Sequence, residues 1–275
     1  MNINLVPGFS QTYPLLFQPT PSDYYVSSTI AWFFTVWMGG FSLLVLPWVF
    51  YKLVKKKDSV PILMWLGGFI ASTNEAMIDH LGHLWWARNL PGPFYSGYDL
   101  HIPLLVPFCY AFGVSMVGYF VYYKMRNGLT MKGVFYVWLV LSAFDVLLEY
   151  PGTLSGAHTY YGDQPFEIGG FPWWWAWVNG TGFLMVGFFL WLAAPHLHGW
   201  SRLLILILPI KGFSAAYGIV AWPSFMALNW EMPVIAAWLL SAFSLVPALL
   251  VVRSIAAFVA KDSPLRLKKW LSVSS

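Results

Sequence analysis

Residues 133–150 have the sequence GVFYVWLVLSAFDVLLEY. As a helix rising about 1.5 Å per residue, this apolar run is long enough to cross the roughly 30 Å hydrocarbon core of a membrane. Its only charged residues are Asp145 and Glu149, and their i, i+4 spacing places both carboxyl groups on one face of the helix. An ionisable group inside a membrane span costs several kcal/mol. The stretch therefore predicts a transmembrane helix that carries an acidic site.

The rest of the chain has the same character. Of its 275 residues, 59% are hydrophobic and 9% are charged, and the mean hydropathy is +0.63. Soluble domains carry about 25% charged residues, so the composition predicts a multi-pass integral membrane protein in contact with membrane lipids. The net charge of +4 is not a signal for nucleic-acid binding, because the basic residues fall at the ends of apolar runs. The single cysteine, Cys109, excludes an intrachain disulfide.

Seven apolar runs are long enough to form membrane-spanning helices. They predict an all-α fold, a polytopic bundle of seven transmembrane helices in a single domain over residues 26–260. An irregular N-terminal arm (residues 1–25) precedes this domain, and a basic cytoplasmic tail (residues 261–275) follows it. The expected spans are residues 26–51, 60–86, 102–124, 132–150, 172–195, 202–228 and 233–258.

The positions of Lys and Arg predict the orientation of these spans. Thirteen of the fifteen lie at span ends that face one side, whereas Arg88 lies on the other side and Lys211 lies within a span. Because basic loops remain in the cytoplasm, we expect the N-terminus outside and the C-terminus in the cytoplasm. Lys211 could extend its side chain to the cytoplasmic face or pair with a carboxyl group.

A second acidic pair, Glu75 and Asp79, has the same i, i+4 spacing in the second span, and His83 continues its stripe. The alternation of seven spans places both acidic pairs in the outer half of the membrane, at similar depth. We therefore expect spans two to five to surround one pocket there. The candidate catalytic residues are Asp145, Glu149, Glu75 and Asp79. The candidate substrate-binding residues are His80, His83, His101, His158, Tyr161, Asn179, Trp173 and Trp177.

Each of these groups also has a purely structural interpretation. An acidic side chain and a histidine can form a hydrogen bond between helices without any further role, although four carboxyl groups at one depth exceed what helix association needs. Tryptophans such as Trp173 and Trp177 are typical of the aromatic belts at membrane interfaces. The acidic and histidine side chains are metal-ligand types, but their spacing matches no metal-binding motif, so we expect neither a metal ion nor a cofactor.

Several short motifs resemble a known family. The motifs are Glu75-Ala76-Met77-Ile78-Asp79, then Ile102-Pro103-Leu104, then Phe144-Asp145-Val146-Leu147-Leu148-Glu149, and then Gly156-Ala157-His158-Thr159-Tyr160-Tyr161-Gly162. Together, over residues 65–190, they resemble the AveC-like spirocyclase family of membrane proteins. The stretch from Glu149 to Tyr161 is also similar to membrane carotenoid hydratases and cyclases. These resemblances imply acid chemistry on a lipophilic substrate, namely spiroketal formation, hydration or dehydration of a polyketide-like or terpenoid-like molecule.

The acidic pairs lead to the same expectation by a separate route. Burial and a neighbouring carboxylate both favour the neutral form of a carboxylic acid, so either pair could hold a proton and act as general acid, with its partner as base. We expect Asp145 and Glu149 to be the acid–base pair. We expect Glu75 and Asp79 to form a second carboxyl site or to act through the neighbouring histidines.

The function that we predict is therefore that of a cofactor-independent cyclase, lyase or isomerase acting on a lipophilic small molecule. One alternative is a proton-coupled transporter or lipophile-binding protein that uses the same carboxyl groups as a proton relay. Another is an assembly factor without chemistry. A polar route to both faces of the membrane would favour transport, whereas a closed pocket would favour an enzyme.

Overall fold

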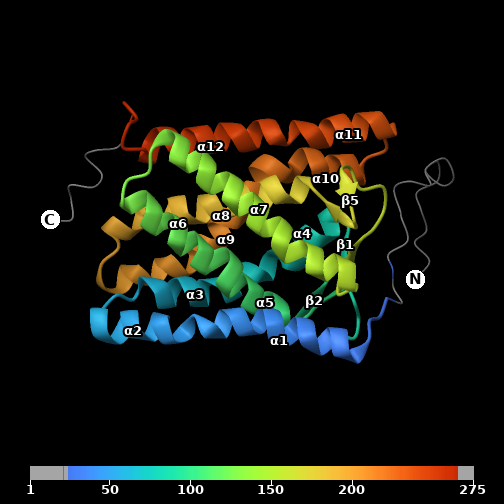
Figure 1. The fold of residues 1–275 in the computed structure, drawn as a ribbon, viewed down its shortest axis with the longest axis horizontal. Helices are drawn as coiled ribbons and strands as arrows, with labels where there is room; N and C mark the ends of the chain where they lie inside the picture. The colour runs from blue at the N-terminus through green and yellow to red at the C-terminus, as the bar shows by residue number, and fades with distance from the viewer. Residues whose placement is uncertain (1–20, 22–23, 266–275) are drawn as a thin grey trace.

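The computed structural model describes residues 21 and 24–265. Almost all of the expected N-terminal arm (residues 1–25) and residues 266–275 of the expected tail lie outside the described residues. Within the described residues the fold is mostly helical, and seven helical segments run back and forth along the long axis of the molecule (Figure 1).

The seven segments follow one another in the order of the chain, and most are built from two or more helical pieces. The first is α1 (Ser28–Leu44) with α2 (Leu46–Lys56). The second is α3 (Val60–Ala71), the 3-10 turn η1 (Ser72–Asn74) and α4 (Glu75–Gly82). The third is α5 (Leu105–Cys109), the π-helical segment η2 (Tyr110–Met116) and α6 (Val117–Arg126). The fourth is α7 (Met131–Ser155), and the fifth is α8 (Trp174–Ala193) with η3 (Ala194–His196). The sixth is η4 (Gly199–Ile207), α9 (Leu208–Ala216), the π-helical segment η5 (Tyr217–Ala221) and α10 (Trp222–Asn229), and the seventh is α11 (Val234–Phe243) with α12 (Leu245–Val259).

Six of these segments are long and apolar enough to cross a membrane, as judged by length and composition: Ser28–Lys56, Leu105–Arg126, Met131–Ser155, Trp174–His196, Gly199–Asn229 and Val234–Val259. The remaining one, residues 60–82, carries the acidic pair Glu75 and Asp79. Large apolar side chains such as Leu147 and Ile235 lie on the outer surface, where they expose 71% and 76% of their area. Such a surface suits contact with lipid better than contact with water, and the six helices fit a multi-pass membrane protein.

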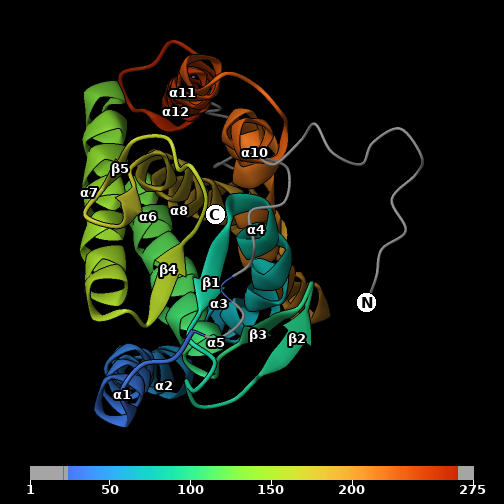
Figure 2. The same cartoon turned by 90° about the vertical axis from the view of Figure 1, so that its right-hand side faces the viewer.

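Short strands close one end of the bundle, at the right of Figure 1 and facing the viewer in Figure 2. Strand β1 (Leu84–Trp86) pairs antiparallel with β4 (His158–Tyr160), β2 (Tyr95–Gly97) with β3 (Leu100–Ile102), and β5 (Glu167–Ile168) with β6 (Phe171–Pro172). The expectation of a purely helical fold is therefore incomplete. The two loops that contain these strands pair across the bundle, because β1 and β4 come from different loops.

The second segment ends earlier than expected. Its helix ends at Gly82 rather than at residue 86, and His83 follows in the left-handed conformation with φ 56°. Residues 84–86 then leave as strand β1. The stripe of Glu75, Asp79 and His83 is therefore interrupted after Asp79, because His83 no longer lies on the helix.

The fourth segment ends later than expected. The expected end at Tyr150 is wrong, since α7 continues through Pro151 to Ser155 and stops at Gly156, where φ is 78°. A proline removes one backbone hydrogen bond of the helix, and transmembrane helices tolerate this loss. The extra turn brings Gly152 beside strand β4.

Helix α8 lies at the centre of the bundle and packs against α6, α7 and α9. Close contacts between helices hold this centre together. A Cβ atom added at Gly118 would lie 2.3 Å from Cγ1 of Val186 in α8, and one added at Gly68 would lie 2.3 Å from Cα of Ala111. Small residues allow such close approach of helices in membranes, so the middle of the bundle is tightly packed.

Candidate functional site

A cavity of about 80 Å³ lies inside the strand end of the bundle. All four candidate catalytic residues, Glu75, Asp79, Asp145 and Glu149, line it. Asp79 and Asp145 each expose 2% of their surface and Glu75 exposes 9%, so three of these four carboxyl groups are shielded from the surroundings of the protein. The two acidic pairs, which are 70 residues apart along the chain, therefore share one cavity.

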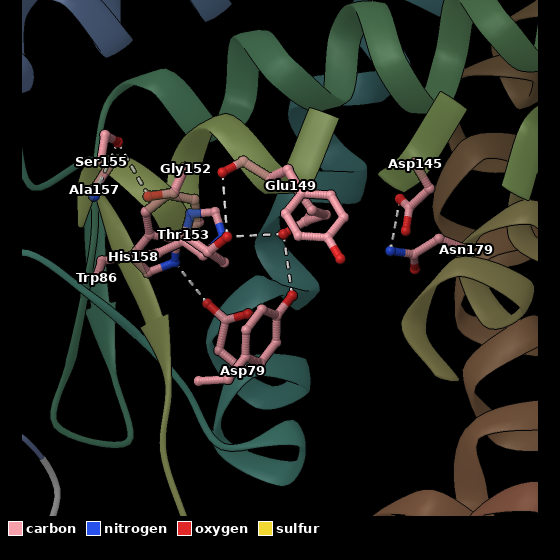
Figure 3. A network of polar contacts seen from close by, with 12 residues as sticks. Asp79, Trp86, Asp145, Glu149, Gly152, Thr153, Ser155, Ala157, His158 and Asn179 are labelled. Carbon is pink, nitrogen blue, oxygen red and sulfur yellow. Dashed lines mark hydrogen bonds and ion pairs between the residues drawn. The ribbon is translucent and has the colours of Figure 1, made fainter. Parts of the chain in front are cut away.

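Strand β4 supplies two side chains that contact Glu149. The hydroxyl group of Tyr160 donates a hydrogen bond to Oε2 of Glu149 at 3.0 Å, and Nε2 of His158 lies 3.0 Å from the same oxygen. Burial raises the pKa of the Tyr160 phenol, so this hydroxyl keeps its proton and remains a donor. Figure 3 shows the side chains of His158 and Asp79 near Glu149, with the contact between Asp145 and Asn179 set apart from them.

The imidazole of His158 is held in place from two sides. The register of β1 against β4 pairs Trp86 with His158, and the two ring centroids are 4.9 Å apart. On the other side lies the backbone of Gly152, where an added Cβ atom would come within 2.2 Å of Cε1 of His158. A glycine is therefore required one helical turn after Glu149 for the ring to reach the carboxyl group.

The second acidic pair has its own donors, and they come from other elements. Nε1 of Trp86 donates a hydrogen bond to Oδ2 of Asp79 at 2.8 Å, and the hydroxyl group of Tyr110 donates to Oε2 of Glu75 at 2.5 Å. The π-helical segment η2 begins at Tyr110. Such segments occur frequently at functional sites because they change the direction of side chains along a helix.

Asp145 of α7 is linked by hydrogen bonds to α8 and, through α8, to η5. The side-chain amide of Asn179 donates to its Oδ1 at 2.9 Å, and the hydroxyl group of Tyr217 donates to Oδ1 of Asn179 at 2.7 Å. The second oxygen of Asp145, Oδ2, is buried and has no hydrogen-bond partner among the described residues. A buried polar atom without a partner costs about 1–3 kcal/mol, which makes Oδ2 the atom most available to a ligand.

A second polar atom of the cavity wall is also unpaired. Nε1 of Trp175 is buried and has no hydrogen-bond partner in the described part of the chain, and Trp175 lines the cavity together with Asp145. Nδ1 of His158, a third residue of this wall, also has no hydrogen-bond partner among the described residues, so the wall offers an unpaired carboxyl oxygen, an unpaired indole N–H and an unpaired imidazole nitrogen. Around them lie apolar and aromatic side chains, among them Leu148, Phe183 and Phe213.

The other expected site residues fall into two groups. His158 and Asn179 line the cavity, whereas His80, His83, His101, Tyr161, Trp173 and Trp177 do not. His80 is exposed and stacks on Tyr98. The ring of His83 stacks on Tyr161 outside the cavity, and its backbone N–H donates a hydrogen bond to the carbonyl oxygen of Asp79.

The remaining members of the second group lie near the surface. His101 is exposed and its Nδ1 lies 2.9 Å from the hydroxyl group of Ser96. Nε1 of Trp173 donates to the hydroxyl group of Tyr150, and Nε1 of Trp177 donates to that of Ser244. Lys211 is exposed on α9 and makes no ion pair with a carboxyl group among the described residues.

Sequence reasoning missed several residues of the cavity wall. Tyr110, Tyr160, Tyr217, Trp86 and Trp175 all line the cavity. Each is one of many aromatic residues in the chain, and no spacing distinguishes it from a membrane-belt residue. The available signal was the short loop motif from Gly156 to Gly162, which contains both His158 and Tyr160.

Among the residues that the structure describes, no group of three His, Cys, Asp or Glu side chains is arranged to hold a metal ion. No family model, curated protein or solved structure matches the chain. Its fold and its site define a mostly helical protein with membrane-length apolar helices and an internal cavity whose wall includes four carboxyl groups.

Proposed function

We propose that this protein is a membrane-embedded enzyme that uses buried carboxyl groups to protonate a lipophilic substrate and to direct its cyclisation, hydration or dehydration. The observation that carries the proposal is the convergence of Glu75, Asp79, Asp145 and Glu149 on one cavity with His158. Helix association alone does not need four carboxyl groups in one place. The resemblance to AveC-like spirocyclases and to carotenoid hydratases supports the same class of reaction on a polyketide-like or terpenoid-like molecule.

The hydrogen bonds of the cavity suggest different roles for Asp145 and Glu149. We assign the general acid to Asp145, because its Oδ2 has no partner in the protein and is free to direct a proton at a substrate. We assign the general base to Glu149, whose Oε2 contacts both Tyr160 and His158. Two carboxyl groups in different environments are the usual arrangement for acid and base in one site.

The reaction then balances without a cofactor. The proton of Asp145 adds to a carbon–carbon double bond, or to a hydroxyl group that leaves as water, and a carbocation forms. Attack by water or by a hydroxyl group of the substrate, or loss of a proton from a neighbouring carbon, resolves the cation. The released proton goes to Glu149 and returns to Asp145 through water. Aromatic rings of the wall, among them Trp175 and Phe213, stabilise a cation by their π faces.

Substrate entry needs a rearrangement of the cavity wall. A cavity of about 80 Å³ holds a few water molecules, whereas pockets for drug-sized ligands are about 300–1,000 Å³. Helix α1 contributes Phe34 and Met38 to the wall and lies at the edge of the bundle (Figure 2). We infer that α1 moves outward to admit the lipophilic substrate from the bilayer.

The packing of the bundle favours an enzyme over a proton-coupled transporter. A transporter needs a polar route from the cavity to the opposite end. Along α8 the cavity wall ends at Phe183, and the helices beyond it approach closely at Gly118 and Val186. This packing supports a closed pocket rather than a path through the membrane.

The proposed orientation puts the end of the bundle that carries the strands outside the cell. The opposite end, called the basic end because it carries residues such as Lys52, Arg126 and Lys261, lies in the cytoplasm. In a Cys109→Ser background, single cysteines at the exposed positions Glu167 and Lys261 should react with a membrane-impermeant maleimide from opposite sides of sealed vesicles. Reaction of both from the same side would contradict the arrangement.

The experiment that tests the proposed reaction uses the purified protein in lipid nanodiscs. Wild-type protein is incubated in D₂O with a total lipid extract of cells that carry the gene, and the products are analysed by mass spectrometry. We expect at least one lipophilic compound to gain deuterium on carbon, or to gain or lose the elements of water. Asp145→Asn and Glu149→Gln should lower this conversion by about 10²–10⁴-fold.

Two comparisons separate chemistry from folding and transport. The matched control is Asp99→Asn, which makes the same chemical change at an exposed loop position and should leave conversion unchanged. All variants should keep the melting temperature of the wild type to within a few degrees. Folded Asp145→Asn and Glu149→Gln variants with full conversion would rule out this pair as acid and base. Proton movement in proteoliposomes without any chemical conversion would favour the transporter.

A further inference from the structure

A second hollow lies at the basic end of the bundle, far from the acidic cavity. Its volume is about 550 Å³, and its wall includes Lys52 of α2, Arg126 of α6 and Arg202 of η4. Trp191 of α8 also lies in this wall, twelve residues after Asn179 of the acidic cavity. At about 1.5 Å per residue, the two sites are roughly 18 Å apart along α8. The basic hollow is therefore a separate site.

The positive charges of this hollow have no carboxylate partners. Asp58 is the one acidic residue of its wall, and Oδ1 of Asp58 accepts a hydrogen bond from the backbone N–H of Val60. Within the described ranges, no Lys or Arg side chain lies within 4.0 Å of a carboxylate. Three cations and one carboxylate leave a net charge of about +2 in the hollow, which favours an anionic ligand.

The basic side chains bond only to neutral groups. Nη1 of Arg126 donates to the hydroxyl group of Tyr122 at 3.2 Å. The guanidinium of Arg202 donates to the carbonyl oxygen of Leu197 at 3.3 Å and to the hydroxyl group of Ser59 at 3.4 Å. These contacts position each guanidinium and leave its charge uncompensated. Both have further N–H groups for a phosphate, whose oxygens match the fork of a guanidinium.

A buried donor of the wall is also unpaired. Trp191 exposes 1% of its surface, and its Nε1 has no hydrogen-bond partner among the described residues. A buried N–H without a partner destabilises a protein, so its presence at this hollow is an independent indication of a ligand that supplies an acceptor.

An apolar groove adjoins the hollow. Its volume is about 540 Å³, and it shares Lys52, Tyr119 and Tyr123 with the hollow. The rest of its wall is apolar and aromatic. It comes from α2, η2 and α6 and from the residue between α1 and α2, with Val45, Trp48, Phe112, Met116, Val117 and Phe120. A charged hollow that opens into a groove of this kind fits a molecule with a phosphate at one end and a hydrocarbon chain at the other.

We propose that the basic hollow and the adjoining groove form a binding site for an anionic phospholipid. The phosphate lies in the hollow between Lys52, Arg126 and Arg202, and an acyl chain lies along Val117 and Phe120 in the groove. Free inorganic phosphate shares the headgroup chemistry but leaves the groove empty, so the two ligands are distinguishable. Membrane leaflets that contain anionic lipids attract basic residues of this kind.

The test uses the full chain, purified in detergent and stripped of lipid, with native mass spectrometry to count bound molecules. The probes are a phosphatidylglycerol, a phosphatidylcholine with the same acyl chains, and inorganic phosphate. We expect one phosphatidylglycerol to bind at saturation, more tightly than phosphatidylcholine and in preference to inorganic phosphate. Arg126→Gln together with Arg202→Gln should weaken binding of phosphatidylglycerol by about 10-fold to 30-fold.

The matched control removes two positive charges from the same end of the molecule but outside the hollow. Lys55→Gln with Lys56→Gln changes two exposed residues at the end of α2 and should leave affinity within about two-fold of the wild type, because exposed charges are screened by salt. Val117→Phe, which fills the groove, should weaken binding of phosphatidylglycerol and leave any binding of inorganic phosphate unchanged.

Several results would overturn the proposal. Equal losses in the two double variants would mean that affinity follows net charge and not this site. Equal binding of phosphatidylglycerol and phosphatidylcholine would exclude recognition of the anionic headgroup. Tight binding of inorganic phosphate together with no effect of Val117→Phe would identify a phosphate site without a lipid. Should the arginine variant unfold, Lys52→Gln gives the same comparison from α2.

Discussion

Replacing Gly152 with alanine tests how the acidic cavity is organised. The added Cβ atom would lie 2.2 Å from Cε1 and 2.5 Å from Nδ1 of His158, whereas carbon atoms in contact are about 3.5–4.0 Å apart. The imidazole must therefore move by more than about 1 Å. It cannot retreat freely, because the ring of Trp86 lies on its other side with a centroid distance of 4.9 Å.

This displacement has a calculable consequence for Glu149. The distance from Nε2 of His158 to Oε2 of Glu149 is 3.0 Å, and a shift of about 1 Å takes it beyond hydrogen-bond range. An extra carbon forced into a filled space costs about 1–3 kcal/mol, the lost polar contact with Glu149 costs about 1 kcal/mol, and replacing glycine by alanine in a helix returns about 1 kcal/mol. We expect a net loss of about 1–3 kcal/mol and a fall in the melting temperature of roughly 2–12 °C.

The same displacement should lower conversion in the D₂O assay by about 100-fold, since a misplacement of about 1 Å in an active site has this effect. The matched control is Gly40→Ala in α1, where an added Cβ atom meets nothing within 4 Å. This control should retain full conversion and melt at or slightly above the temperature of the wild type. A Gly152→Ala protein that is as stable and as active as the wild type would refute the assigned position of His158.

Three further predictions concern stability. Asn179→Leu removes the amide that links Asp145 to Tyr217, so it should lower the free energy of unfolding by about 1–3 kcal/mol in SDS titrations; an unchanged midpoint would contradict this bridge. Gly118→Ala places a Cβ atom 2.3 Å from Cγ1 of Val186 and should cost about 1–3 kcal/mol in the same titration, and a variant as stable as Gly40→Ala would argue against tight packing of α6 on α8. Burial lowers the pKa of His83 below its ordinary value of 6.5. Between the ordinary pKa of 6.5 and the lower pKa of the folded state, the imidazole is protonated in the unfolded chain and neutral in the folded protein. The free energy of unfolding should therefore fall as the pH drops through this interval. His83→Gln should flatten the fall in melting temperature between pH 7 and the lower pH of the folded-state titration, and an identical pH profile for the variant and the wild type would exclude His83 as the titrating group.

The sequence by itself predicted seven membrane-spanning helices. Helical segments lie at all seven places with bounds that agree to within a few residues at most ends, and six of them are long and apolar enough to cross a membrane. The reason is that the transfer of a helix into lipid depends on the local content of apolar side chains, which can be read from any window of the chain. The largest differences are at three ends. The first segment continues to Lys56 instead of ending at residue 51, and the segments that end at Gly82 and Ser155 differ where the chain leaves the bundle toward the strands. At Gly82 and Ser155, the pairing of β1 with β4 determines where the helix ends. Local composition does not record this pairing.

The acidic residues of the cavity were also visible in the sequence, because a carboxyl group in an apolar helix is unusual in itself. Their partners were not. Tyr110 lies 35 residues from Glu75, and Tyr217 lies 38 residues from Asn179. Such contacts depend on which helix faces pack against each other, and the spacing of residues along the chain does not predict that packing.

The histidines illustrate the same limit. His80, His83, His101 and His158 are equally plausible neighbours of the acidic pairs in the sequence, but only His158 lines the cavity. The register of one short strand pair and the missing side chain of Gly152 bring its ring to Glu149. Local composition determines which segments can enter a membrane, whereas the directions of side chains in a packed bundle depend on all its helices at once, so the tertiary structure alone decided which residues share the cavity.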